Sequence, residues 1–96
     1  MDTEFVVIAQ NKDIPLNSTN ILQSFKTDQS GCLMACNIDL FCNFVIFKSS
    51  GICYKMMKNG LNQLVVSTEP TTIFQSQKYF DKFNNKYLLK SYIKIN

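Results

Sequence analysis

Four cysteines at positions 32, 36, 42 and 53 constrain this chain of 96 residues more than any other feature of its sequence. A chain of this length forms one domain and buries only a modest hydrophobic core. Covalent cross-links would therefore contribute a large share of its stability. Four cysteines allow three disulfide pairings, and their spacing along the chain reduces that choice.

The first two cysteines lie on a predicted helix. Thr27 or Asp28 can accept hydrogen bonds from the free N–H groups of a first helical turn, so we expect the helix to start there and to run to about Ile38. Cys32 and Cys36 are then one turn apart, with Cβ atoms about 5–6 Å from each other. A disulfide needs roughly 3.5–4.5 Å between the Cβ atoms. These two cysteines therefore cannot bond to each other, although both point at the sheet.

The other two cysteines lie on the strands that follow the helix. Cys42 opens a strand close to the helix end that carries Cys36. A two-residue turn at Ser50–Gly51 would place Cys53 opposite Lys48 on the returning strand. The side of the sheet that faces the helix would then carry Cys42, Phe44, Ile46 and Cys53. The sequence thus predicts the disulfides Cys36–Cys42 and Cys32–Cys53.

Stable disulfides form in oxidising compartments, so two of them predict a secreted, extracellular protein. A zinc site is the competing interpretation, but zinc sites usually take short Cys-x2-Cys pairs from turns and often include histidine. Here the first pair is Cys-x3-Cys on a helix, and the chain has no histidine. The Cys-x-x-Cys motif of redox proteins is also missing. We therefore expect neither a metal nor another cofactor.

Apolar runs separated by turn signals predict the rest of the fold. Strands are expected over residues 5–10, 21–25, 41–47, 52–57, 61–66 and 73–80, with a hairpin turn at Asn59–Gly60 and a loop around Pro70. One helix packed on an antiparallel meander of about five strands makes an α+β fold. The face away from the helix would stay apolar at Val45 and Phe47, and would be covered by the chain termini or by a partner.

The cysteine-containing segments resemble the PAN/apple family. They read CLMAC over residues 32–36, CNFVIF over residues 42–47 and GICY over residues 51–54. In that family a helix with Cys-x3-Cys precedes a strand opened by a third cysteine, and the fourth cysteine lies in the next strand. The resemblance extends over residues 4–82, so we expect a PAN/apple-like domain over residues 1–82. Apple domains in the narrow sense add a third disulfide between their terminal strands; this chain lacks it and resembles the shorter PAN type.

The resemblance implies a helix that two disulfides staple to the central strands, in an extracellular module that binds proteins or carbohydrates. Ligand-binding residues vary within the family, so only the structural cysteines carry over. The residues themselves argue against an enzyme. Without histidine the chain lacks the usual general base near neutral pH, its seven acidic residues are scattered, and its cysteines are committed to structure.

Charge and hydropathy exclude two further classes. The net charge is +3, and all ten basic residues are lysines. Nucleic-acid-binding proteins usually show clustered arginine and a stronger basic bias, so we expect no nucleic-acid partner. No apolar run approaches the roughly 20 residues that span a bilayer, which argues against membrane insertion. The first residues carry neither the basic nor the long apolar segment of a signal peptide, so none is expected within them.

Two polar motifs could mark surface sites. Residues 17–19 form the acceptor sequence for N-glycosylation at Asn17, in a predicted loop, although such triplets also occur by chance in an asparagine-rich chain. Lysines recur every four residues near the C-terminus. They could form a stripe that binds sulfated glycans or anionic lipid, or they could only protect an edge from aggregation. These lysines are Lys78, Lys82, Lys86, Lys90 and Lys94.

Residues 83–96 form a C-terminal extension beyond the resemblance. A tight turn is expected at Asn84–Asn85, and Tyr87, Leu89, Ile93 and Ile95 then alternate with polar residues, apart from a break at Ser91. That period predicts a strand with one apolar face. It could pair with the chain's own sheet or be donated to a neighbour. The alternative to a binding module is therefore a structural protomer that self-associates into an oligomer or filament through its sheet face and this strand.

Overall fold

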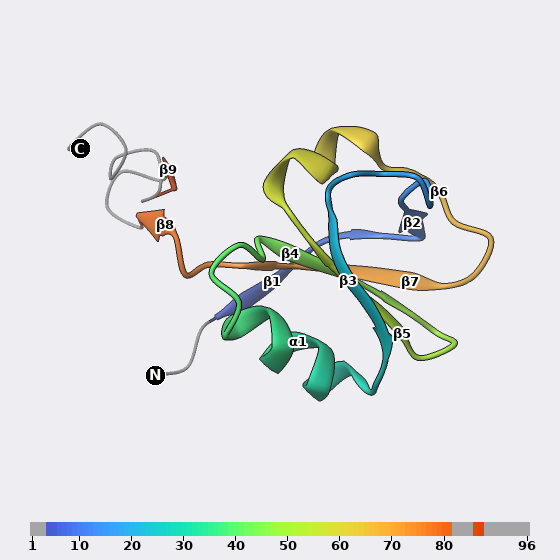
Figure 1. Ribbon diagram of the computed structural model, residues 1–96, viewed down its shortest axis with the longest axis horizontal. Helices are drawn as coiled ribbons and strands as arrows, with labels where there is room; N and C mark the ends of the chain where they lie inside the picture. Colours follow the sequence, from blue (N-terminus) through green and yellow to red (C-terminus); the bar gives the residue numbers. More distant parts are fainter. Residues whose placement is uncertain (1–3, 82–85, 88–96) are drawn as a thin grey trace.

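The computed structural model describes residues 4–81 and 86–87 (Figure 1). Its centre is an antiparallel sheet of five strands in the order β1 (Phe5–Gln10), β7 (Thr71–Ser76), β4 (Phe44–Lys48), β5 (Ile52–Met56) and β3 (Ile21–Lys26). Helix α1 (Gln29–Asn37) packs on one face of this sheet, against β4 and β5. The α+β fold class is confirmed. The sheet is not a simple meander, because β7 lies between β1 and β4.

Helix α1 begins where the sequence predicts. Asp28 has extended backbone angles, and its Oδ1 accepts a hydrogen bond of 2.8 Å from the N–H of Gly31. The helix ends at Asn37, one residue before the expected end. Its buried residues are the two cysteines, Cys32 and Cys36, which anchor it to the sheet.

The β4–β5 hairpin differs from the expected register by one residue. Cys53 lies opposite Phe47, not Lys48. The reason is the turn, which contains Ser49 and Ser50 followed by Gly51 at φ +91°. The N–H of Gly51 donates to the carbonyl of Lys48 at 2.9 Å. A β-turn followed by a glycine in the left-handed region is a three-residue connection, whereas the sequence was interpreted as a two-residue one.

This register reverses the predicted faces of β4. Val45 and Phe47 point to the helix side, where Val45 is completely buried together with the four cysteines. Phe44 and Ile46 point to the other side, where they form a second core. The expectation that Phe44 and Ile46 face the helix was therefore wrong. The further members of the second core are Ile14, Tyr54, Met56 and Ile73.

The second face is covered by the chain between β5 and β7. The predicted Asn59–Gly60 hairpin is wrong, because residues 58–63 form a 3-10 helix, η1 (Lys58–Gln63). Of the strand expected over residues 61–66, only β6 (Val65–Val66) forms, and it pairs with β2 (Lys12–Asp13) instead of β5. Leu61 and Leu64 pack on the second core. Among the residues that the structure describes, Ile14 from the segment after β1 also belongs to this second core.

The surroundings of Gly60 explain why the predicted hairpin turn at Asn59–Gly60 is wrong. Gly60 is buried, and a Cβ atom there would lie 2.8 Å from the Cε of Met56 and 3.2 Å from the Cζ of Phe44. The residue is needed for close packing of η1 on the second core and not for a positive φ.

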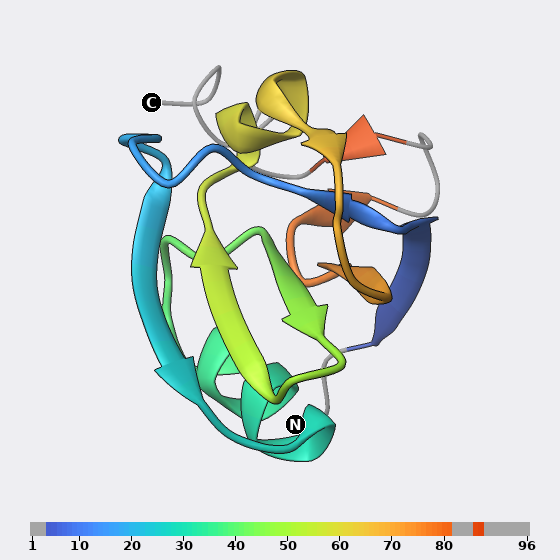
Figure 2. The ribbon, with the colours of Figure 1, turned by 90° about the vertical axis from the view of Figure 1, so that its right-hand side faces the viewer.

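The chain leaves the sheet after β7 and forms a small separate ribbon. Strands β8 (Phe80–Asp81) and β9 (Lys86–Tyr87) pair antiparallel, with Phe80 opposite Tyr87. Figure 2 shows β1 and β3 at the two sides of the sheet, with β4 and β5 between them. The predicted turn at Asn84–Asn85 and the predicted strand after Tyr87 lie outside the described residues.

Candidate functional site: an apolar tip at the end of the helix

A group of large apolar side chains is exposed where α1 ends and the chain crosses to β4. Met34 is 66% exposed, Ile38 82%, Leu40 75% and Phe41 72%. We call these four residues the apolar tip. Isolated exposed apolar residues are ordinary, but several of them gathered in one short segment of the chain make that segment a candidate interaction surface. The sequence had placed Phe41 at the start of a buried strand, which is wrong because β4 begins only at Phe44.

The disulfide Cys36–Cys42 closes the base of the loop that carries the tip. Its two Cα atoms are 5.2 Å apart. Within the loop, the N–H of Asp39 donates to the carbonyl of Cys36 at 3.2 Å, and the N–H of Cys42 donates to the carbonyl of Asp39 at 3.1 Å. The Asp39 carboxylate accepts a further hydrogen bond of 2.9 Å from the N–H of Phe41. The loop is therefore a closed turn, with these three hydrogen bonds inside it.

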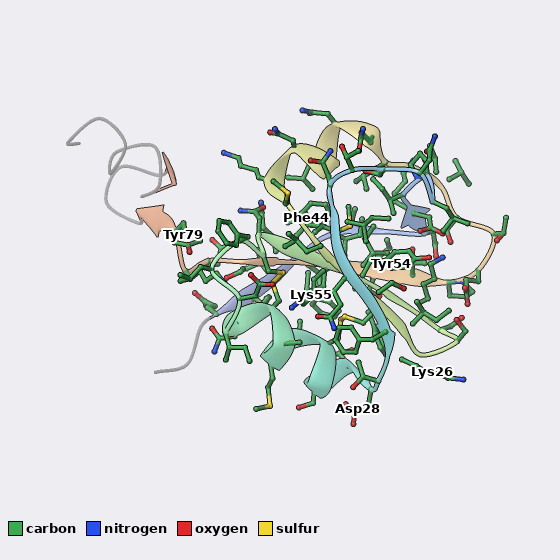
Figure 3. All side chains as sticks on the ribbon, in the orientation of Figure 1. Lys26, Asp28, Phe44, Tyr54, Lys55 and Tyr79 are labelled. Atoms are coloured by element: carbon green, nitrogen blue, oxygen red, sulfur yellow. A yellow bond between two sulfur atoms is a disulfide. The ribbon has the colours of Figure 1, made fainter. Side chains whose placement is uncertain are left out.

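Side chains from outside the loop hold it in place. The Lys78 ammonium donates to the carbonyls of Asp39 at 2.6 Å and Cys36 at 2.7 Å, with a longer contact of 3.4 Å to that of Asn37. The Tyr79 hydroxyl donates to the carbonyl of Leu40 at 2.7 Å. Figure 3 shows Tyr79 at the end of the molecule from which β8 departs. The segment after β7 thus donates hydrogen bonds to carbonyl groups in the last turn of α1 and in the loop that follows it.

The charge of the loop is also compensated from the sheet. Lys55 of β5 reaches the Asp39 carboxylate at 2.9 Å, with both side chains mostly buried. The hydrogen bond from Lys55, together with that from the N–H of Phe41, lowers the pKa of Asp39 although partial burial acts in the opposite direction. Burial lowers the pKa of Lys78, and the nearby Asp39 carboxylate opposes that shift. The ionised Asp39 carboxylate therefore links the loop backbone, through the N–H of Phe41, to Lys55 of the sheet.

These contacts hold the backbone of the loop in the conformation that exposes the apolar side chains of the tip. Four apolar side chains stand in solvent on a backbone that a disulfide, an ion pair and several hydrogen bonds hold. A surface that is already ordered loses little conformational entropy when it binds. Exposed aromatic and aliphatic side chains that enter a partner's pocket supply most of the energy of many interfaces. The arrangement suits binding to an apolar partner surface.

The structure places the predicted disulfides as expected. Cys32 bonds to Cys53 and Cys36 bonds to Cys42, and all four cysteines are completely buried. Sequence reasoning missed the tip itself. The sequence feature that could have indicated the tip is the spacing of the bonded cysteines. Only five residues separate Cys36 from Cys42, and a loop this short cannot bury Ile38, Leu40 and Phe41.

The structure describes three of the other predicted surface residues, namely Asn17, Lys78 and Lys86. Asn17 is exposed in a turn that the N–H of Ser18 closes on the carbonyl of Pro15 at 2.9 Å, so it is accessible for modification. Lys78, the first residue of the predicted basic stripe, is partly buried and caps α1. Lys86 lies in β9, while Lys82, Lys90 and Lys94 lie outside the described residues.

A shallow, uncharged depression lies away from the tip. Amide and hydroxyl side chains surround Phe47 there. Its lining residues are Gln10, Asn11, Gln29, Phe47, Ser49, Pro70, Thr71 and Thr72. An aromatic ring beside uncharged hydrogen-bonding groups is chemistry that a sugar could use.

Comparison of the chain with protein-family models, curated proteins and solved structures gives no match. Within residues 4–81 and 86–87, no helix combines the length and apolar character needed to cross a membrane. The same residues contain no group of three or more histidine, cysteine or acidic side chains that could hold a metal ion.

Proposed function

We propose that this protein is an extracellular, non-catalytic binding module of the PAN/apple type, and that it binds a protein ligand through the apolar tip. The observation that carries the proposal is the exposure of Ile38, Leu40 and Phe41 on a loop closed by Cys36–Cys42. A chain that leaves three large apolar side chains in water on a rigid loop forgoes the stability that their burial would contribute. A binding function accounts for that loss.

Two disulfides support the extracellular location. All four cysteines are paired and completely buried, and bonds of this kind persist in oxidising compartments. The two-disulfide staple of a helix onto central strands also agrees with what the resemblance to the PAN/apple family implies.

The chemistry of the tip favours a protein over a carbohydrate. Aliphatic and phenyl groups pack into apolar pockets but offer no partner to sugar hydroxyls. A carbohydrate would instead suit the depression around Phe47, where Gln29 and Thr72 supply amide and hydroxyl groups. The two ligand classes therefore correspond to two separate surfaces, which can be tested independently.

The test is binding of the labelled, oxidised domain to a panel of secreted proteins and glycans. The informative variants are Leu40→Ser and Phe41→Ser, alone and combined. The controls are Leu16→Ser and Val66→Ser, which remove equally exposed apolar side chains (80% and 76%) away from the tip. Saturable binding to a protein should fall strongly in the tip variants and stay unchanged in the controls.

Protein binding that survives the double tip variant, or that falls equally in the controls, would contradict the proposal. So would a domain that binds only glycans and loses that binding on Gln29→Ala. That outcome would assign recognition to the depression around Phe47 instead of the tip.

A further inference from the structure

The turn between β2 and β3 carries the acceptor sequence for N-linked glycosylation. Residues 17–19 read NST, with a threonine two positions after Asn17 and no proline between them. The acceptor asparagine must be followed in this way, and no other asparagine of the chain is. The N–H of Ser18 closes the turn on the carbonyl of Pro15 at 2.9 Å, so the backbone that presents Asn17 has a defined conformation.

Side-chain contacts alternate along this turn. The Ser18 hydroxyl donates a hydrogen bond to Oε1 of Gln63 in η1, and Nδ2 of Asn20 donates to the same atom at 3.0 Å. Asn17 and Thr19 are exposed, and within the part of the chain that the structure describes neither side chain makes a hydrogen bond. The fold therefore holds the residues beside them and leaves accessible the amide and the hydroxyl that the acceptor sequence requires.

The acceptor sequence and the apolar tip lie on opposite faces of the sheet. On one side of the turn Ile14 belongs to the second core, and on the other the carbonyl of Asn20 accepts a hydrogen bond of 2.9 Å from the N–H of Met57. Both anchors lie on the face that η1 covers, whereas α1 and the tip at its end lie on the other face (Figure 1). A bulky, solubilising glycan on Asn17 would therefore leave the tip free to bind.

We propose that Asn17 carries an N-linked glycan, on the face of the sheet opposite α1. In the transfer step, the amide nitrogen Nδ2 of Asn17 forms a bond to the anomeric carbon of an oligosaccharide. The donor is an oligosaccharide joined to a lipid through diphosphate, so the bond from the anomeric carbon to the phosphate oxygen breaks. The lipid diphosphate leaves with the bonding electrons, and the amide loses one proton. The proposal rests on the extracellular location proposed above, because N-glycosylation at such a sequence modifies surface loops of secreted proteins.

Mass spectrometry of the native protein tests the glycan and the extracellular location separately. Cleavage after Lys12 and Lys26 without reduction yields residues 13–26, which contain the acceptor sequence and no cysteine. This peptide should carry a glycan, and enzymatic release of that glycan should leave aspartate at position 17. The cysteine peptides of the same digest report whether both disulfides have formed. Both disulfides with an unmodified Asn17 would overturn the glycan and leave the location standing, whereas free thiols with an unmodified Asn17 would overturn both.

Variants secreted from cultured eukaryotic cells show which residues the modification needs. Asn17→Gln and Thr19→Ala should each lose the whole mass of the glycan, whereas Thr19→Ser should keep it because serine also supplies the hydroxyl. Asn59→Gln is the matched control, since Asn59 is exposed but lies outside an acceptor sequence. All these variants should fold, because each replaces an exposed side chain. A glycan that persists in Asn17→Gln, or that is lost in Asn59→Gln, would contradict the assignment to Asn17.

Discussion

The ammonium nitrogen of Lys78 lies 2.6 Å from the carbonyl oxygen of Asp39, although the two residues are 39 positions apart in the sequence. With its second bond to Cys36, this contact makes Lys78 a cap for the C-terminus of α1 and a support for the apolar tip. A cation at this end of a helix also interacts favourably with the helix dipole. The residue that sequence periodicity assigned to a basic surface stripe thus has a structural role in the candidate site.

Replacing Lys78 should destabilise the domain and loosen the tip. Lys78→Met keeps much of the apolar stem but removes the hydrogen bonds to the carbonyl groups of Cys36 and Asp39. Hydrogen bonds from charged groups are each worth about 1.5–3 kcal/mol, and 1 kcal/mol shifts Tm by about 4–8 °C in a domain of this size. The loss of even one of these bonds should therefore lower Tm by at least about 6 °C. Lys26→Met is the control, since Lys26 is exposed and the described residues supply it with no ion pair. Equal Tm values for the two variants would refute the capping role.

The disulfide Cys32–Cys53 should contribute more stability than Cys36–Cys42. The first closes a sequence separation of 21 residues and the second a separation of 6. Loop entropy then gives about 3 and about 2 kcal/mol. Replacing both cysteines of each pair by alanine avoids free thiols. Denaturant unfolding should show the larger loss for the Cys32/Cys53 variant; equal or reversed losses would show that native-state packing outweighs chain entropy.

The Asp39–Lys55 ion pair should make stability depend on pH in the acidic range. The hydrogen bond from Lys55 lowers the pKa of Asp39 in the folded protein below its ordinary value of 3.8. The ion pair therefore contributes its full stabilisation above about pH 3.8. That stabilisation is lost as the pH falls through the lowered pKa of folded Asp39. Tm of the wild type should therefore drop below pH 4 more steeply than Tm of Asp39→Asn. Parallel curves for the two proteins would mean that Asp39 does not contribute to acid sensitivity.

Gly60 should not tolerate a side chain. The Cβ of alanine would lie 2.8 Å from the Cε of Met56 and 3.2 Å from the Cζ of Phe44. The methionine end is flexible, but both side chains are completely buried, so they can give way only into the packed second core. Overpacking of this kind costs typically about 1–3 kcal/mol. Asn59→Ala, at the neighbouring exposed position, is the matched control. A Gly60→Ala variant as stable as this control would indicate that the core yields without cost.

The helix and its disulfides were predictable because their signals are local. Asp28 marks the N-cap, and the i,i+4 spacing of Cys32 and Cys36 excludes a bond between them. The pairing was predicted correctly even though the face of β4 was not. Cys42 precedes β4 and so does not follow the alternation of that strand, while the one-residue register shift at Gly51 puts Cys53 on the helix side with Val45 and Phe47.

The remaining errors concern contacts between distant segments. Asn59–Gly60 has the composition of a hairpin turn, but packing of η1 on Phe44 and Met56 decides its structure. The position of β7 between β1 and β4 likewise depends on contacts between distant segments, and no short sequence motif indicates it. The candidate site was missed for the same reason, since the loop after α1 is held by Lys55 and Lys78 from separate parts of the chain.

Disulfide mapping of the native protein is the decisive measurement, because the closed loop that carries the apolar tip and the proposed extracellular location both depend on the pairing of the cysteines. Cleavage after Met34, before Asp39, and after Lys48 and Lys55, without reduction, puts each cysteine on its own peptide. The Cys32 peptide should be linked to the Cys53 peptide and the Cys36 peptide to the Cys42 peptide, with no free thiol. Free thiols, or any other pairing, would contradict this expectation.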